Sequence, residues 1–134
     1  METLQFVVTP GYGERLHRSL NYSQAVKIGD IVEISGQGGW TDMVDVPGDL
    51  REEYALAFDN VARVLAAAGA SWADVYSVDS FHVGLDDDAL RLSAALLKQH
   101  MPNRQPIWTV LGVAKLADER MHIEIRVKAK INSV

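Results

Sequence analysis

The segment that most constrains the fold is "MHIEIRVKAKI" (residues 121–131), in which apolar and polar side chains alternate without interruption. Side chains on a β-strand project to opposite faces in turn, so this segment predicts a strand with one apolar face and one polar face. The apolar face consists of Met121, Ile123, Ile125 and Val127, and the polar face of His122, Glu124 and Arg126. Such a strand belongs to a sheet that other elements cover on its apolar face.

Two segments have the periodicity of amphipathic helices that can provide this cover. In residues 48–71, Asp49 is positioned as the N-cap, Gly69 marks the end, and apolar residues recur at intervals of three and four. These residues are Tyr54, Ala57, Phe58, Val61, Val64, Leu65 and Ala68. In residues 85–102, the aspartates 86–88 supply a cap and an acidic first turn, and Pro102 prevents continuation. The apolar stripe predicted for this second helix is Leu90, Ala94, Leu97 and Met101.

Six segments rich in β-branched residues and bounded by Gly, Asp or Pro predict strands: 4–8, 22–29, 30–40, 74–83, 106–113 and 121–131. The order of strands, helix, strand, helix and strands favours an α+β fold with two helices on one face of a mixed sheet. A doubly wound parallel sheet fits this order less well. Since no internal repeat or linker divides the chain, residues 1–134 are expected to form a single domain.

The segment "IVEISGQ" (residues 31–37) has no fully polar face. One side of the predicted strand carries Val32, Ile34 and Gly36, and the other side carries Ile31, Glu33, Ser35 and Gln37. A sheet that is apolar on both sides is usually buried on both sides, which indicates an oligomer.

Composition excludes several function classes. The net charge of -5 and the absence of a basic run disfavour a nucleic-acid partner. Without cysteine there is no disulfide, thiolate nucleophile or cysteine-ligated zinc, and the four histidines form no metal-binding motif, so no metal is expected. Neither a signal peptide nor an apolar run of membrane-spanning length is present, so we expect a cytoplasmic protein without a membrane segment. "GYGER" and "SGQGG" lack the spacing of phosphate-binding loops.

Three segments together resemble the YjgF/RidA family of reactive intermediate deaminases, also described as endoribonuclease L-PSP. They are "YSQAVKIGDIVEISGQ" (22–37), "AFDNVARVLAAAGASWADV" (57–75) and "IEIRVKAKI" (123–131). The resemblance covers nearly the whole chain. It implies a chorismate-mutase-like fold and a homotrimer whose sheets face inward, with three clefts between neighbouring subunits, which agrees with the doubly buried sheet.

The resemblance also implies a chemistry. Deaminating members hydrolyse 2-imino acids, or their enamine tautomers, to 2-keto acids and ammonia without metal or cofactor. Glu124 matches the family glutamate that orients water, and Tyr22 matches the tyrosine of the N-terminal motif, so both are predicted catalytic residues. Ser35, Gly36 and Gln37 fall where the family's strand lines the cleft, and they are predicted to bind the substrate.

Trp108 departs from the pattern of the deaminating members. The resemblance places it at an arginine whose guanidinium binds the substrate carboxylate through two parallel hydrogen bonds. An indole can stack on a flat ligand but cannot neutralise an anion. Val110 matches the family's cysteine, and Trp40 is a candidate second aromatic wall. We therefore predict that Trp108, Thr109 and Val110 bind a substrate in a more apolar cleft, and that this branch lacks the carboxylate-binding arginine.

Structural interpretations remain open for these residues. Trp108 could fill a subunit interface, and Glu124 could pair with Arg126 or His122. Arg104 or Arg120 could supply the positive charge missing at Trp108.

Two functions follow. The first is a cofactor-free hydrolase, similar to imine or enamine deaminases, that acts on a small reactive metabolite in an inter-subunit cleft. The alternative is a trimeric small-molecule binding or regulatory protein without the deaminase chemistry. A ribonuclease role is disfavoured by the acidic balance of the chain.

Overall fold

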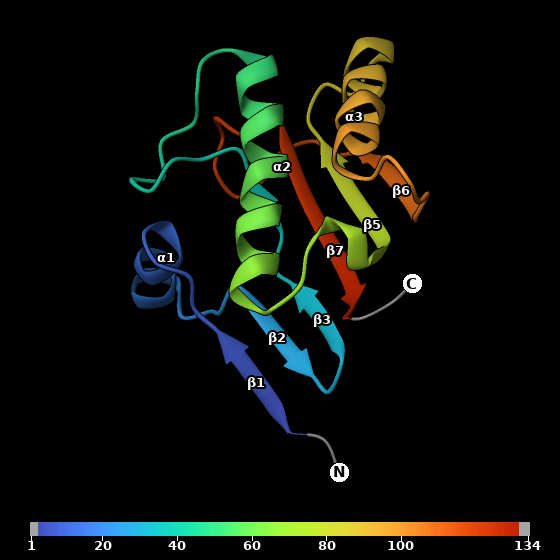
Figure 1. Cartoon of the computed structure of the whole chain (residues 1–134). Coiled ribbons are helices and arrows are strands. Elements are labelled where there is room, and N and C mark those ends of the chain that lie inside the picture. The colour runs from blue at the N-terminus through green and yellow to red at the C-terminus, as the bar shows by residue number, and fades with distance from the viewer. Residues whose placement is uncertain (1–2, 132–134) are drawn as a thin grey trace.

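A single mixed sheet with helices on one face organises the chain, as the computed structural model of residues 3–131 shows (Figure 1). In chain order the elements are β1 (Leu4–Val7), α1 (Tyr12–Leu20), β2 (Ala25–Ile28), β3 (Ile31–Ile34), β4 (Gln37–Gly38), α2 (Leu50–Ala67), a short 3₁₀ helix (Trp72–Asp74), β5 (Val75–His82), α3 (Asp87–His100), β6 (Ile107–Gly112) and β7 (Ile123–Lys130). The sheet order is β1-β2-β3-β7-β5-β6, and β4 also pairs with β7. Among the strands of residues 3–131, β5 and β6 are the one parallel pair. The predicted α+β class with a mixed sheet is confirmed.

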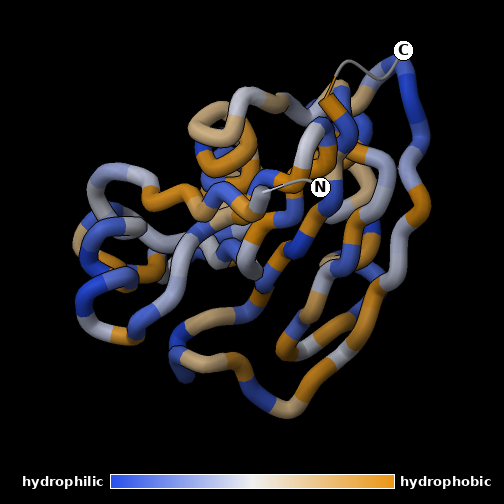
Figure 2. The backbone as a smooth tube through the Cα atoms, turned by 90° about the horizontal axis from the view of Figure 1, so that it is seen from below, coloured by the Kyte–Doolittle hydropathy of each residue, from blue (hydrophilic) through white to orange (hydrophobic). Residues whose placement is uncertain are grey.

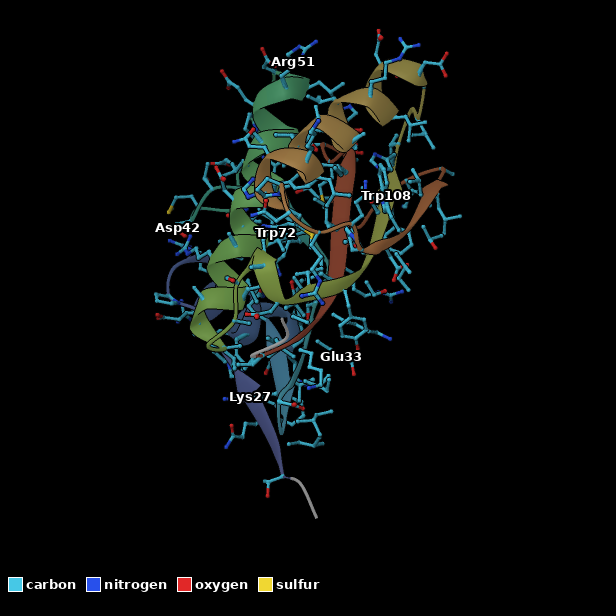
Figure 3. All side chains as sticks on the ribbon, turned by 45° about the vertical axis from the view of Figure 1, so that its right-hand side comes forward. Lys27, Glu33, Asp42, Arg51, Trp72 and Trp108 are labelled. Carbon is cyan, nitrogen blue, oxygen red and sulfur yellow. The ribbon has the colours of Figure 1, made fainter. Side chains whose placement is uncertain are left out.

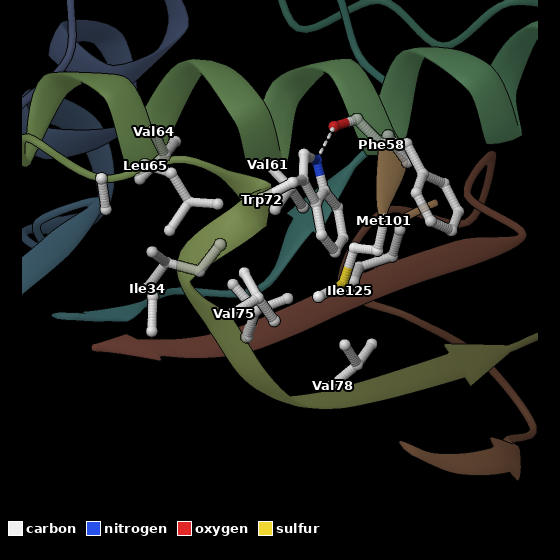
Figure 4. Packing of buried hydrophobic residues seen from close by; sticks show 14 of the residues in the cluster. Ile34, Phe58, Val61, Val64, Leu65, Trp72, Val75, Val78, Met101 and Ile125 are labelled. Atoms are coloured by element: carbon white, nitrogen blue, oxygen red, sulfur yellow. Dashed lines mark hydrogen bonds between the residues drawn. The ribbon is translucent and has the colours of Figure 1, made fainter. Parts of the chain in front are cut away.

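The helix α2 covers the centre of the sheet and follows the sequence prediction closely. Asp49 caps it by accepting hydrogen bonds from the backbone N–H groups of Arg51 (2.7 Å) and Glu52 (3.3 Å), which contributes about 1 kcal/mol. The chain turns away at Gly69, whose φ of 83° favours glycine. All seven residues of the predicted stripe are buried. Figure 4 shows four of them, Phe58, Val61, Val64 and Leu65, together with Trp72, Val75 and Ile125 in the core. The Trp72 indole N–H donates to the carbonyl of Phe58 (3.2 Å).

The buried face of α3 differs from the predicted stripe. Leu90 and Ala94 are exposed, whereas Ala89, Ser93 and Leu96 are buried. The other half of the stripe is confirmed, because Met101 is buried and Leu97 packs against the core. Ser93 can be buried because its hydroxyl donates to the carbonyl of Ala89 (2.8 Å) within the helix. Ser93 is not among the apolar residues of the predicted stripe, and the observed buried face is rotated toward it.

The helix α1 is a third helix, and its presence corrects the expectation of two. It starts after Gly11, whose φ is 74°, and ends at Asn21 in a left-handed conformation. Tyr12 and Leu16, four residues apart, pack with Trp40 and Met121 in a small second core. Tyr12, Leu16 and Leu20 recur at intervals of four, but nine residues give too short a periodic signal to predict a helix.

The predicted alternation of the last strand is confirmed, because Met121, Ile123, Ile125 and Val127 are all buried beneath the helices. Hydrophobic and hydrophilic residues alternate along the strands in Figure 2. The polar face of β7 is not covered by a helix, and Arg126 there binds Asp79 of β5 (3.1 Å).

Strand register places two apolar flanks on this uncovered face. The β1 flank consists of Leu4 and Phe6, and the β6 flank of Ile107 and Leu111, all exposed by 48 to 71%.

Within residues 3–131, no helix has both the length and the hydrophobicity needed to cross a membrane.

Candidate functional site

A cavity of about 620 Å³ lies between α1, the 41–46 loop and the β7 end of the sheet. It contains four of the residues predicted from sequence, namely Tyr22, Ser35, Gly36 and Glu124, together with Trp40. Asp118 and Glu119 add two carboxylates to the lining. The remaining walls are apolar and consist of Leu16, Leu20, Val44, Ala117 and Met121. The fold thus brings together segments that are about 100 residues apart in the chain.

A β-bulge forms the polar edge of the cavity. Glu33 pairs with Lys128 and Gln37 pairs with Ile125, so the β3–β4 side contains one more residue than the β7 side between these pairs. The extra residue interrupts the strand around Ser35 and Gly36. Bulges redirect side chains and often adjoin functional sites. Here the bulge sets Ser35 and Gly36 against Glu124 of β7.

Gly36 is required for the position of the Glu124 carboxyl group. A Cβ atom at residue 36 would lie 2.5 Å from Cδ and 2.6 Å from Oε2 of Glu124, closer than non-bonded carbon and oxygen atoms approach. The backbone of Gly36 is not in the left-handed region, so its role is to permit close approach. The bulge and the missing side chain of Gly36 together leave the space that the Glu124 carboxyl group occupies, which we call the Gly36 seat.

Two ionisable groups of the cavity have perturbed pKa values. Burial raises the pKa of Glu124, and the nearby charge of Arg126 only partly offsets the increase. Burial also raises the pKa of Tyr22; the Gln24 side chain opposes this, and the charge of Glu124 adds to it. Tyr22 is therefore an uncharged hydrogen-bond donor at neutral pH, close enough to Glu124 to sense its charge.

The partners considered for Glu124 from sequence bind other carboxylates. His122 contacts Glu53 through its ring Nδ1 (2.8 Å to Oε1), and its backbone N–H donates to Oε2 (2.6 Å). Arg126 donates to Asp79 and stacks over the Phe81 ring at 5.6 Å. Glu124 is thus not part of either pair.

Gln37 lies behind the cavity and supports it. Its side-chain N–H groups donate to Oε1 of Gln24 (2.8 Å) and to the carbonyl of Ser35 (3.0 Å), and its Oε1 accepts from the Tyr12 hydroxyl (2.7 Å). Ser35 in turn donates through Oγ to the carbonyl of Ser23 (2.7 Å) and through its backbone N–H to that of Gln24 (2.8 Å). These bonds fix the bulge against the segment that carries Tyr22.

Trp108, Thr109 and Val110 do not line this cavity. Strand register places Trp108 beside Val78 on the helix-covered face of β6, whereas Thr109 is exposed on the other face. Trp108 borders a separate cavity of about 390 Å³ that is rimmed by Lys98 and Arg104. In Figure 3, Trp108 and Asp42, which belongs to the 41–46 loop, lie on opposite sides of α2.

A buried hydrogen-bonded chain holds the Trp108 indole. Its Nε1–H donates to Oγ of Ser80 (2.9 Å), which lies 2.8 Å from Nε2 of His82. Nδ1 of His82 is 2.9 Å from the Tyr54 hydroxyl. Burial lowers the pKa of His82, so this histidine is neutral at pH 7. Trp108 is therefore anchored to the core through Ser80.

The two arginines considered as substitutes for the missing charge differ in location. Arg120 binds Asp118 and Asp45 and donates to the carbonyl of Val44. Arg104 borders the Trp108 cavity, and one of its N–H groups donates to the carbonyl of Ala73 (2.9 Å). Of the two, only Arg104 lies near Trp108.

Sequence reasoning missed the outer wall of the cavity. Leu16 and Leu20 come from the unpredicted helix α1, and their spacing of four was the available signal. Val44, Asp118 and Glu119 come from loops, which have no periodicity to detect. Among residues 3–131, no group of three or more histidines and carboxylates is arranged to hold a metal ion.

Comparison with known proteins identifies the relatives of this chain. Residues 13–131 match the protein family described as Endoribonuclease L-PSP. The RutC family protein YjgH of Escherichia coli is 32% identical over 124 residues, which are 92% of this chain and 93% of that protein. A 2-iminobutanoate/2-iminopropanoate deaminase of Dermatophagoides farinae is 34% identical over 106 residues, 77% of this chain and 81% of that protein. A solved structure of protein YJGH superposes with a TM-score of 0.84 at 30% identity and covers 97% of this chain and 98% of its own.

Proposed function

The chain belongs to the endoribonuclease L-PSP (YjgF/RidA) family, and on this premise we propose that it is a cofactor-free hydrolase of imines or enamines. The observation that carries the proposal is the Glu124 carboxyl group, which lies against Gly36 and lines the same cavity as Tyr22, where most of the walls are apolar. The relative named as an iminobutanoate and iminopropanoate deaminase supports this reaction class.

In the proposed reaction, water attacks the carbon of a protonated imine, R₂C=NH₂⁺. The C–N bond of the resulting adduct then breaks, which yields R₂C=O and ammonium. Glu124 accepts a proton from the attacking water and returns it to the amine nitrogen of the adduct. As the C–N bond breaks, Glu124 takes the remaining hydroxyl proton and passes it to the released ammonia, while the uncharged Tyr22 donates a hydrogen bond to the substrate. Because a protonated imine is already electrophilic, orientation and proton transfer supply most of the required acceleration.

Ammonia release from freshly generated imines tests this function. A panel of imines is produced in situ, 2-imino acids by an amino acid oxidase and carboxylate-free imines by a flavin-dependent amine oxidase, and ammonia is measured with the wild type and with Glu124→Gln. The proposal requires release above the spontaneous rate that depends on Glu124. Equal rates with and without the protein across the panel would reject it.

A second candidate is a small-molecule binding or regulatory protein. The apolar walls of the cavity, and an indole rather than a guanidinium at residue 108, favour this alternative for carboxylate-free ligands. It predicts saturable binding of a neutral aromatic molecule without ammonia release from any imine.

We also propose that three chains assemble head to tail into a ring. The β1 and β6 flanks lie at opposite edges of the uncovered face, so a head-to-tail contact between them can repeat around a closed ring. Packing the β6 flank of one chain on the β1 flank of the next covers both. The same contact brings the edge that carries Trp108 to the neighbour's cavity, which would make each cleft a product of two subunits.

The assembly proposal predicts that Ile107→Lys dissociates the trimer. Ile107 is 71% exposed in the single chain, and an unpaired charge in its place would be buried at the interface. The expected penalty is about 3 kcal/mol per interface, or roughly a hundredfold in association. Light scattering measures the mass, and Leu90→Lys on the exposed side of α3 is the matched control. A wild type that is monomeric in dilute solution would contradict the proposal.

Trp108→Arg is expected to increase activity toward imines of small aliphatic amino acids. A buried bidentate contact to a carboxylate contributes about 2 to 5 kcal/mol, so we expect a gain of at least roughly thirtyfold in kcat/KM. Trp108→Phe, which keeps an aromatic face but loses the bond to Ser80, should show no such gain. If the wild type turns over these imines rapidly and Arg104→Gln does not affect it, Trp108 is not the limiting residue.

A further inference from the structure

Val44 has a backbone conformation that valine rarely adopts. Its φ is 63°, in the left-handed region, and Asn21 is the only other non-glycine residue within 3–131 with a positive φ. Asparagine tolerates this region because its short polar side chain bonds locally, whereas a β-branched side chain clashes with the backbone. Such strain persists only where the surroundings enforce it, and it concentrates at functional sites.

The strained residue borders the candidate site. Val44 lines the 620 Å³ cavity and packs on the small core of Tyr12, Leu16, Trp40 and Met121. Within its loop, the Val44 N–H donates to the carbonyl of Thr41 (2.8 Å), and the Thr41 N–H donates to the carbonyl of Asp45 (2.9 Å). The loop is therefore closed on itself, with Val44 turned against the cavity.

Arg120 joins this loop to the segment that carries Asp118. Its Nη2 donates to the carbonyl of Val44 (2.9 Å) and to Oδ2 of Asp118 (2.7 Å), and its Nε donates to Oδ1 of Asp118 (3.0 Å). Asp118 itself lines the cavity. These bonds lower the pKa of Asp118 to about 2, so the ion pair persists at neutral pH. One guanidinium thus joins the two loops that form the outer wall.

We propose that Val44 determines the size of ligand that the cavity accepts, and that Arg120 is the positioning residue that holds it there. The inference rests on the proposed function only in taking this cavity as the ligand site; it does not require deaminase chemistry. The ligand class is a neutral or cationic molecule with a compact apolar part. The wall at Val44 is apolar, Asp118 is already paired with Arg120, and the carboxylate of Glu119 disfavours an anion.

Val46 provides a matched control for the backbone strain and for the size limit at Val44. It lies in the same loop, is also valine and packs on the same small core, but its φ is not positive and it does not line the cavity. The test compares Val44→Ala and Val44→Gly with Val46→Ala and Val46→Gly. Thermal unfolding reports the strain, and calorimetric titration with phenol and with the larger 2-naphthol reports the size limit.

Glycine at residue 44 should unfold at a higher temperature than alanine, by about 3 °C, because alanine keeps the Cβ clash. The order should be reversed at residue 46, where glycine has the usual disadvantage. Both Val44 variants should favour 2-naphthol over phenol by roughly tenfold more than the wild type does. The Val46 variants should keep the wild-type ratio.

Arg120→Lys tests the positioning role. Lysine retains the charge but cannot bind Asp118 and the Val44 carbonyl with one planar group, so part of the size selection should be lost. An unchanged ratio in the Val44 variants, or no binding of either probe to any variant, overturns the inference. Failure of the proposed function is a separate result, namely probe binding without ammonia release from imines.

Discussion

Glu124→Gln is expected to reduce ammonia release by at least about a hundredfold, which is the usual contribution of a positioned general base. Glutamine has nearly the same shape as glutamate and fits the seat over Gly36, but it cannot accept a proton from water. The loss should therefore appear in kcat rather than in KM. Glu14→Gln on the exposed surface of α1, which makes the same chemical change, is the control.

The raised pKa of Glu124 sets the pH dependence of this activity. The carboxylate is the active form, so the rate should rise with pH through a midpoint above the ordinary value for glutamate. The effect on stability has the opposite direction. A carboxyl group whose pKa is higher in the folded state destabilises the fold once it ionises, so the glutamine variant should be at least as stable as the wild type at pH 7. A destabilised Glu124→Gln variant with a normal rate would mean that Glu124 is structural.

Gly36→Ala is expected to cause a comparable loss of activity with little loss of stability. The added Cβ would lie 2.5 Å from Cδ of Glu124, and the flexible end of that side chain can move away at a cost of about 1 kcal/mol. This movement takes the carboxylate away from the position that orients water, so we expect the rate of ammonia release to decrease roughly a hundredfold. Gly48→Ala is the control, because a Cβ there would meet no atom within 4 Å.

A double variant gives the sharper test of the Gly36 seat. If the alanine acts only by displacing Glu124, then Gly36→Ala combined with Glu124→Gln should be no less active than Glu124→Gln alone. Additive losses would mean that Gly36 contributes in another way, for example through its backbone groups. An active Gly36→Ala single variant would show that the carboxyl group does not need its present position.

The elements that could be predicted from sequence are those with long periodic signals. The seven-residue stripe and caps of α2 and the alternation of β7 were sufficient to place them correctly. The helix α1 was not predicted, because only Tyr12 and Leu16 mark its buried side and tertiary contacts, including Arg63 at 5.0 Å over the Tyr12 ring, stabilise the rest. The face of α3 was misplaced because a serine that bonds within its own helix reads as polar.

The candidate site was predictable in part for similar reasons. Tyr22, Ser35, Gly36 and Glu124 could be named from the family pattern, and the fold places them around one cavity. The one-residue bulge that makes them adjacent has no signature in hydrophobic periodicity. Trp108 lies away from this cavity, on the other side of α2, because it occupies the helix-covered face of the edge strand β6. A short apolar strand does not specify which of its faces is covered, so this location could not be predicted.

The central place of β7 in the sheet has a consequence for how the protein is made. β7 follows every other strand in the chain, yet it pairs with β3, β4 and β5 at once. While the chain is being synthesised, β3 and β5 each present an unpaired edge until residue 130 has emerged, an interval on the order of seconds. Exposed edges of this kind recruit other strands, so nascent chains of this fold are natural clients for chaperones. The strand that ends this interval also carries Glu124, so core closure and site assembly occur in a single late step.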